Sequence, residues 1–179
     1  FDKTQMPYVV DENILHRMWC KWMLNVGVNQ TLAVYNDVFR RVHQEGEARE
    51  TLKAAMREVL ALSQKEGTGL TEQDFRDYLQ IIDELNPDGM PSMRQDRLAK
   101  RLTEVDFFAG TVIQKAEKHA LPVPVNRKLY DEIKSFEEND FIKIDGTVLI
   151  YNNEPQINIR RIRKSLEGEY DPMDYIPST

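Results

Sequence analysis

A proline-free segment from Glu12 to about Tyr35 constrains the fold of this chain more than any other feature. Its length and its content of Leu, Met, Val and Trp predict one long helix. Apolar side chains fall on most sides of this helix and leave no solvent-exposed face of the usual width. They are Leu15, Met18, Trp19, Trp22, Met23, Leu24, Val26, Val28 and Leu32. Such a helix belongs in the centre of a helical bundle, so we expect an all-α fold.

The segments that follow show the apolar period of helices that pack around such a centre. The expected helices begin near Glu47, Thr71, Ser92, Thr103 and Val125, and the last of them ends near Asn139. Ser92 to Gln95 has the Ser-x-x-Gln form of a capping box, which predicts Ser92 as the N-cap of a short helix. No internal repeat is visible.

Charge and the content of cysteine and histidine limit which partners and sites are expected. The net charge is −6 and the pI is about 5.2, which disfavours nucleic acid or an anionic membrane as a partner. Cys20 is the single cysteine, so no disulfide within the chain is possible. The three histidines are scattered, and we expect no metal site. The sequence contains neither a membrane-spanning apolar run nor a signal peptide, so a cytoplasmic location is expected.

A polar stripe interrupts the central helix. Lys21, Asn25 and Asn29 follow one another at four-residue intervals. In a helix they spread over about 80° of arc and roughly 12 Å of length, which matches a small molecule. On geometry alone the stripe could be the narrow solvent-exposed face of the helix. The alternative is that it lines a cleft whose donors hold a polar substrate.

Four motifs in order decide between these interpretations by resemblance. Residues 19–33 read W-x-K-x-x-x-N-x-x-x-N-x-x-x-A, residues 92–96 read S-M-x-Q-D, residues 101–110 read R-x-T-E-V-D-x-x-x-G, and residues 122–126 read P-x-P-x-N. Their order and spacing resemble the C-terminal domain of the ketopantoate reductase family over about residues 10 to 138. The resemblance implies a helical bundle of the type found in the C-terminal domain of 6-phosphogluconate dehydrogenase.

The resemblance also implies a reaction, the NADPH-dependent reduction of 2-dehydropantoate (ketopantoate) to pantoate. In the family the lysine at Lys21 is the general acid and the glutamate at Glu104 assists it. Asn25, Asn29 and Ser92 match the residues that hold the substrate. An ammonium group suits this chemistry because hydride addition to a ketone develops negative charge on oxygen. We expect the five side chains to line one open groove.

The sequence has no Gly-x-Gly-x-x-Gly motif and begins at Phe1 without an initiator methionine. We therefore interpret the chain as a fragment that lacks the N-terminal Rossmann domain, the expected site of NADPH, and expect it to be inactive alone. Two alternatives stay open. The chain could be a helical interaction or dimerisation module, or it could belong to a relative that reduces another 2-oxo acid.

Residues 1–140 are expected to form the substrate-binding domain, and residues 141–179 an extension. From Phe141 to Tyr151, apolar residues alternate around Asp145-Gly146 and predict a β-hairpin that turns there. A lone hairpin is marginally stable, so its apolar face must pack on the bundle, on the nucleotide-binding domain or on a second copy of the chain. We favour a second copy, and so a homodimer, because two-fold pairing is the commonest way to cover such a face.

Overall fold

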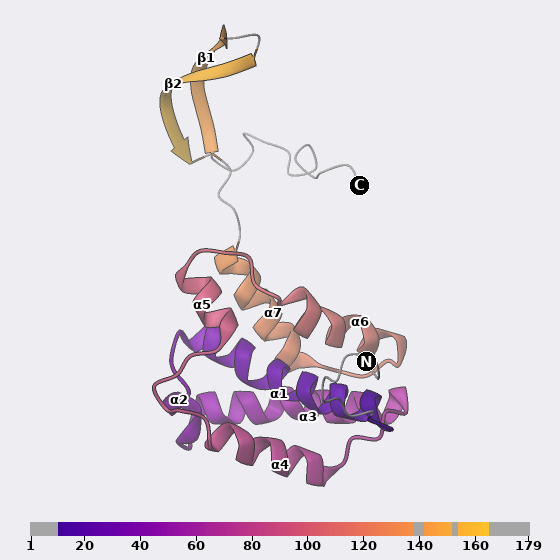
Figure 1. The fold of residues 1–179 in the computed structure, drawn as a ribbon. Coiled ribbons are helices and arrows are strands. Elements are labelled where there is room, and N and C mark those ends of the chain that lie inside the picture. The colour runs from indigo at the N-terminus through magenta and orange to yellow at the C-terminus, as the bar shows by residue number, and fades with distance from the viewer. Residues whose placement is uncertain (1–10, 138–141, 152–153, 165–179) are drawn as a thin grey trace, which may run out of the picture. The chain divides into compact units, whose positions relative to one another are not determined.

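The computed structural model describes residues 11–137, 142–151 and 154–164. It divides into a helical unit up to Glu137 and a unit from Glu138 onward, and each is described by itself. The helical unit contains seven α-helices and one π-helical turn, η1, within the described residues. The expected all-α bundle followed by a small C-terminal hairpin is confirmed (Figure 1).

The central helix of the bundle is α1 (Ile14–Tyr35), as the apolar pattern predicted. Figure 1 shows it between α3 on one side and α6 and α7 on the other. Met23, Val26 and Leu32 on α1 are fully buried. The helix ends at Tyr35, and the left-handed backbone of the C-cap Asn36 (φ 51°) lets the N–H of the following Asp37 bond to the Leu32 carbonyl at 3.2 Å.

The other elements surround α1. They are α2 (Arg40–His43), α3 (Glu47–Glu66), α4 (Glu72–Asp83), α5 (Ser92–Leu98), η1 (Asp106–Gly110), α6 (Thr111–Lys118) and α7 (Pro124–Glu137). Contacts with α1 come from α2, α3, α4, α5, α7 and η1. None of the helices within the described ranges is long and apolar enough to cross a membrane.

Close packing between α1 and α3 depends on a glycine. A Cβ atom added to Gly27 would lie 2.5 Å from the Met56 Cγ and 3.3 Å from the Leu52 carbonyl oxygen, both on α3. Only a residue without a side chain therefore allows the two backbones to approach this closely. Gly27 therefore serves helix packing and is not part of the polar stripe.

Two helix starts differ from the expectation. The N-cap of α5 is Pro91, whose carbonyl accepts the Gln95 N–H at 3.2 Å, so the capping box predicted at Ser92 is wrong. Ser92 is the first residue inside the helix, and its hydroxyl is free to bond elsewhere. The helix expected from Thr103 begins instead with the π-helical turn η1, because the Gly110 N–H reaches back five residues to the Val105 carbonyl.

The C-terminal unit is an antiparallel hairpin of β1 (Ile142–Tyr151) and β2 (Glu154–Lys164). The hairpin is confirmed, but the turn predicted at Asp145-Gly146 is wrong: these residues lie inside β1 at a register irregularity. A Cβ atom at Gly146 would come 2.7 Å from the Asn158 carbonyl oxygen. The glycine therefore permits a bulge and close strand approach, which is the other common role of glycine in a strand.

Candidate functional site

The polar stripe of α1 and the start of α5 meet in a chain of hydrogen bonds. The Ser92 hydroxyl donates to the Asn29 Oδ1 at 3.3 Å, and the Asn29 Nδ2 donates to the Asn25 Oδ1 at 3.4 Å. Asn29 is 7% exposed, Asn25 is half-buried and Ser92 is exposed. Three of the five predicted site residues, from two motifs far apart in the sequence, are thus in direct contact.

This arrangement leaves polar groups available for a ligand. The side-chain amides of Asn25 and Asn29 both use their carbonyl oxygens as acceptors in these hydrogen bonds. The Asn25 Nδ2 has no partner among the described residues. Burial of Asn29 costs little because both ends of its amide are bonded. The open end at Asn25 and the exposed Ser92 hydroxyl could therefore bond to hydroxyl or carboxylate groups of a small molecule.

Lys21 and Glu104 form no hydrogen bond with Ser92, Asn29 or Asn25 within the described residues. Lys21 lies one helical turn before Asn25 and is exposed, and it has no ion pair within the described residues. Glu104 is exposed in the bend before η1. The structure does not pair the two side chains with each other, so the shared groove stays a prediction.

The segment that follows Glu104 is nevertheless fixed against α1 at two points. The Trp22 Nε1 donates to the Phe107 carbonyl at 3.2 Å, and the Gln30 Oε1 accepts the Ala109 N–H at 2.9 Å. Trp22 directly follows Lys21 in the sequence, and Phe107 lies three residues after Glu104. The motif that contains Glu104 therefore lies alongside the motif that contains Lys21.

Gln30 is a structural residue that the sequence analysis overlooked. Its Nε2 donates to the Val26 carbonyl at 2.7 Å and to the Asn126 Oδ1 at 3.1 Å, and its side chain is fully buried. Asn126 belongs to the P-x-P-x-N motif, and its Nδ2 donates to Glu58 at 2.7 Å. A glutamine outside the polar stripe of the central helix was the available signal, because a buried amide must find partners.

Glu58 also anchors the start of α7. Its carboxylate accepts the backbone N–H groups of Val125 and Asn126 at 2.8 and 2.9 Å. A carboxylate at this place bonds N–H groups that have no partner within the helix and suits the positive end of the helix dipole. The fourth motif of the resemblance thus stabilises the bundle and does not enter the polar stripe.

Arg97 holds α5, and with it Ser92, against the end of α1. Its Nη1 donates to the carbonyl oxygens of Ala33 and Val34 in the last turn of α1. Its guanidinium lies 4.2 Å from the centre of the Phe136 ring on α7. The charge therefore binds carbonyls that the helix itself leaves without donors, and it joins three helices next to the site.

Asp106 is likewise structural. Its two carboxylate oxygens accept from Lys134 and from the Tyr130 hydroxyl, each at 2.8 Å. The hydrogen bond from Lys134 lowers the pKa of this carboxyl, and the bond from Tyr130 adds to the effect. Both partners lie on α7, so Asp106 ties η1 to that helix.

An apolar pocket of about 250 Å³ lies beside the first half of α1. Its lining is Leu15, Met18, Trp19, Trp22, Thr111 and Lys115. Met18 is 61% exposed and the nearby Phe107, bonded to Trp22, is 74% exposed. Large apolar side chains exposed together mark a surface on which another protein segment or a ligand can pack.

Comparison with solved structures defines the class of fold. The chain is similar to a dimeric ketopantoate reductase from Staphylococcus aureus, with a TM-score of 0.69 and 22% identity, over 76% of this chain and 47% of the other. It is also similar to D-mandelate dehydrogenase, with a TM-score of 0.64 and 20% identity, over 71% and 42% of the two chains. At these identities the likeness establishes a shared helical fold.

Sequence comparison defines the family. Residues 13–137 match the family model described as "Ketopantoate reductase PanE/ApbA C terminal". The chain is 30% identical over 151 residues to the 2-dehydropantoate 2-reductase of Shigella flexneri, which covers 82% of this chain and 47% of the relative. It is 31% identical over 128 residues to that of Salmonella typhimurium, over 70% and 40% of the two. The chain therefore belongs to the ketopantoate reductase family, and it spans about half the length of the curated relatives it matches.

Proposed function

We propose that this chain is the substrate-binding and proton-donating half of a 2-dehydropantoate 2-reductase. The observation that supports this most is the hydrogen-bonded chain Ser92–Asn29–Asn25, because it joins two separate family motifs at one surface. The name shared by the curated relatives supports the same reaction.

In this proposal each group has a distinct task. Asn25, Asn29 and Ser92 bind the hydroxyl and carboxylate groups of ketopantoate, which are present before and after reduction. The Lys21 ammonium, exposed one turn away, stabilises the oxygen that gains negative charge and donates a proton to it. Glu104 approaches from the segment fixed by Trp22 and keeps the lysine charged and oriented.

NADPH supplies the hydride when it is bound, but the residues of this chain do not fit a dinucleotide. The sequence contains no glycine-rich turn of the Gly-x-Gly-x-x-Gly type, whose backbone N–H groups would hold the pyrophosphate. We therefore propose that a nucleotide-binding Rossmann domain of the same enzyme binds NADPH, and that the 179-residue chain alone neither binds NADPH nor turns over substrate.

The substrate class is tested with a matched pair of 2-oxo acids and the full-length enzyme that contains this chain. One is ketopantoate and the other is 3,3-dimethyl-2-oxobutanoate, which differs only by lacking the hydroxyl group. A site whose amides and hydroxyl bond to that group discriminates by at least about 10²-fold in kcat/KM. Equal kcat/KM values would contradict the proposal and favour the alternative of a relative that reduces another 2-oxo acid.

A further inference from the structure

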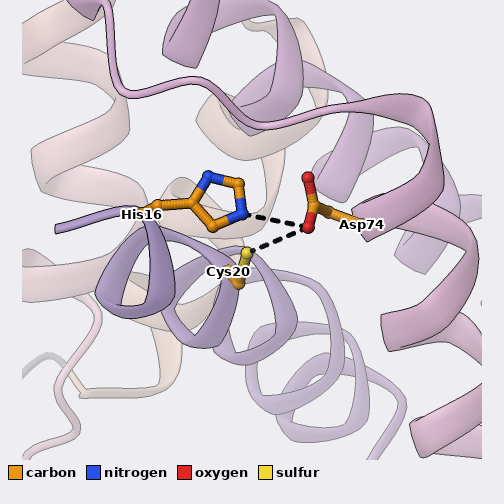
Figure 2. A group of neighbouring side chains, drawn as sticks. All are labelled: His16, Cys20 and Asp74. Atoms are coloured by element: carbon orange, nitrogen blue, oxygen red, sulfur yellow. Dashed lines mark hydrogen bonds and ion pairs between the residues drawn. The ribbon is translucent and has the colours of Figure 1, made fainter. Parts of the chain in front are cut away.

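A second cluster of reactive side chains lies on another side of α1 from the polar stripe. Figure 2 shows His16 and Cys20, one helical turn apart on α1, both pointing toward Asp74 near the start of α4. The His16 Nε2 lies 3.0 Å from the Asp74 Oδ1, and the Cys20 Sγ lies 3.7 Å from the same oxygen. All three potential ligand atoms lie within 4.8 Å of one another.

These separations are close to those of a tetrahedral metal site. Bonds of about 2.0–2.3 Å to N, O and S ligands at tetrahedral angles place neighbouring ligand atoms roughly 3.3–3.8 Å apart. The two distances to the Asp74 Oδ1, 3.0 and 3.7 Å, depart from this range by a few tenths of an ångström or less. The His16 and Cys20 ligand atoms lie within 4.8 Å of each other, and ion binding would require side-chain rotations that bring all three separations into the tetrahedral range.

Asp74 is oriented for this task by residues that are not themselves ligands. The Thr71 backbone N–H and hydroxyl both bond to the Asp74 Oδ2, at 2.7 and 2.6 Å. The other oxygen, Oδ1, is therefore left facing His16 and Cys20. Hydrogen bonds that fix a ligand in this way are a common feature of protein metal sites.

Burial and charge also suit a divalent ion. The side chains of His16 and Asp74 are 24% and 20% exposed, and Cys20 is 2% exposed. The site is thus sheltered, while His16 and Asp74 keep part of their surface open to solvent. A thiolate and a carboxylate together would balance the two positive charges of the ion.

We propose that His16, Cys20 and Asp74 bind one zinc ion, with water as the fourth ligand, and that the ion links α1 to α4. A nitrogen, a sulfur and an oxygen donor form a set that zinc accepts, whereas magnesium and calcium require oxygen ligands. The site is separate from the proposed reaction, because Lys21 is exposed on a different side of α1.

Without a metal ion, Cys20 is a protonated thiol. Burial raises the pKa of the Cys20 thiol to about 11, and the neighbouring Asp74 carboxylate adds to the increase. The thiol therefore stays protonated near neutral pH and donates weakly to Asp74. A zinc ion would take the place of that proton, so binding releases a proton and is weakened by acid.

Cobalt(II) is the spectroscopic probe for this site. The reduced, metal-free 179-residue protein is titrated with Co²⁺, and visible absorption is recorded. We expect one equivalent to bind with the intense visible bands of a tetrahedral ion and a thiolate-to-cobalt band in the near ultraviolet. Added Zn²⁺ should abolish both and should raise the Tm of the wild type.

Variants distinguish this site from binding elsewhere. Cys20→Ser should remove the thiolate band and the Zn²⁺-dependent increase in Tm, and Asp74→Asn should weaken binding at least about tenfold. His119→Gln changes a histidine that bonds to Glu66 and should leave both signals intact. Circular dichroism confirms that each variant is folded. A folded wild type without the thiolate band, or a band that survives in Cys20→Ser, would overturn the proposal.

Discussion

Gln30 connects the motifs of this chain more directly than the residues proposed for binding do. Its amide joins α1 to η1 and α7 through Ala109 and Asn126, with no exposure to solvent. Replacing it with leucine would leave the buried Ala109 N–H and the Asn126 Oδ1 without partners. We expect Gln30→Leu to lower the free energy of unfolding by about 2–4 kcal/mol, measured by urea denaturation.

Gln80→Leu is the matched control for this prediction. Gln80 is exposed on α4 and bonds only to Glu84 within the described residues. Its replacement should change the free energy of unfolding by no more than about 0.5 kcal/mol. Equal effects of the two substitutions would show that the Gln30 network does not stabilise the bundle.

Acid should weaken the bundle through Asp106. Its pKa in the folded state lies below the ordinary value of 3.8, because of the hydrogen bond from Lys134. The unfolded chain therefore binds a proton more readily, and the stabilisation present above the ordinary pKa is lost as the pH falls through the folded-state pKa. We expect Asp106→Asn to flatten the fall in Tm on acidification below about pH 4. An unchanged slope would contradict this role.

The sequence selected candidate site residues but not the contacts between them. Asn29 and Ser92 were selected from separate motifs and share a hydrogen bond in the structure, while their role in binding a substrate stays a prediction. Ser92 was also expected to be an N-cap, but Pro91 takes that position because its extended backbone (φ −71°, ψ 160°) already suits a helix start. The cluster around Asp74 was missed because His16 and Asp74 lie 58 residues apart, and the scattered histidines predicted no metal site.

At the scale of elements, the contact between α1 and α3 makes a prediction about Gly27. Alanine would favour the helix by about 1 kcal/mol, but its Cβ would overlap Met56 at 2.5 Å. Overpacking of this kind costs about 1–3 kcal/mol, so we expect Gly27→Ala to lower the free energy of unfolding by roughly 1 kcal/mol.

A double-mutant cycle with Met56→Ala separates the two effects. Once Met56 is shortened, the two nearest atoms are gone and only the Leu52 carbonyl oxygen remains, at 3.3 Å, so Gly27→Ala should become close to neutral. The measurement is urea denaturation of the two single variants and the double variant. If Gly27→Ala were equally harmful in both backgrounds, Met56 would not be the cause.

Elements with a simple apolar period were predicted well, and irregular ones were not. The ranges of α1, α3 and α7 follow from apolar spacing, since each helix buries a continuous surface. The start at η1 could not be read from such spacing, because a π-helical turn shifts the period by one residue. The strand β2 was not assigned, and Gly146 was taken for a turn because a bulge and a turn share the same residue preference.

At the scale of the whole molecule, the hairpin taken by itself has an apolar face. Val148 and Ile157 are cross-strand partners, and they are 66% and 59% exposed, with Ile150 at 78% on the same face. We predict that a second copy of the chain covers this face. Ile150→Lys combined with Ile157→Lys should then convert a dimer to a monomer in sedimentation velocity.

Thr147→Lys is the control for this experiment, because Thr147 is exposed on the opposite face of the hairpin. It adds one positive charge outside the apolar face and should leave the dimer intact. A wild type that sediments as a monomer, or a doubly substituted chain that stays dimeric, would contradict the prediction.

Steady-state kinetics of the full-length enzyme test the central proposal most directly. Ketopantoate-dependent oxidation of NADPH is compared for Lys21→Ala, Asn29→Ala and the control Lys118→Ala, which removes another exposed lysine. We predict that Lys21→Ala lowers kcat by about 10²–10³-fold with little change in KM, because the ammonium acts on charge formed in the transition state. Asn29→Ala should act mainly on KM, and Lys118→Ala should change neither. A Lys21→Ala enzyme with near-normal kcat, alongside an Asn29→Ala enzyme without activity, would contradict the assignment of Lys21 as the acid.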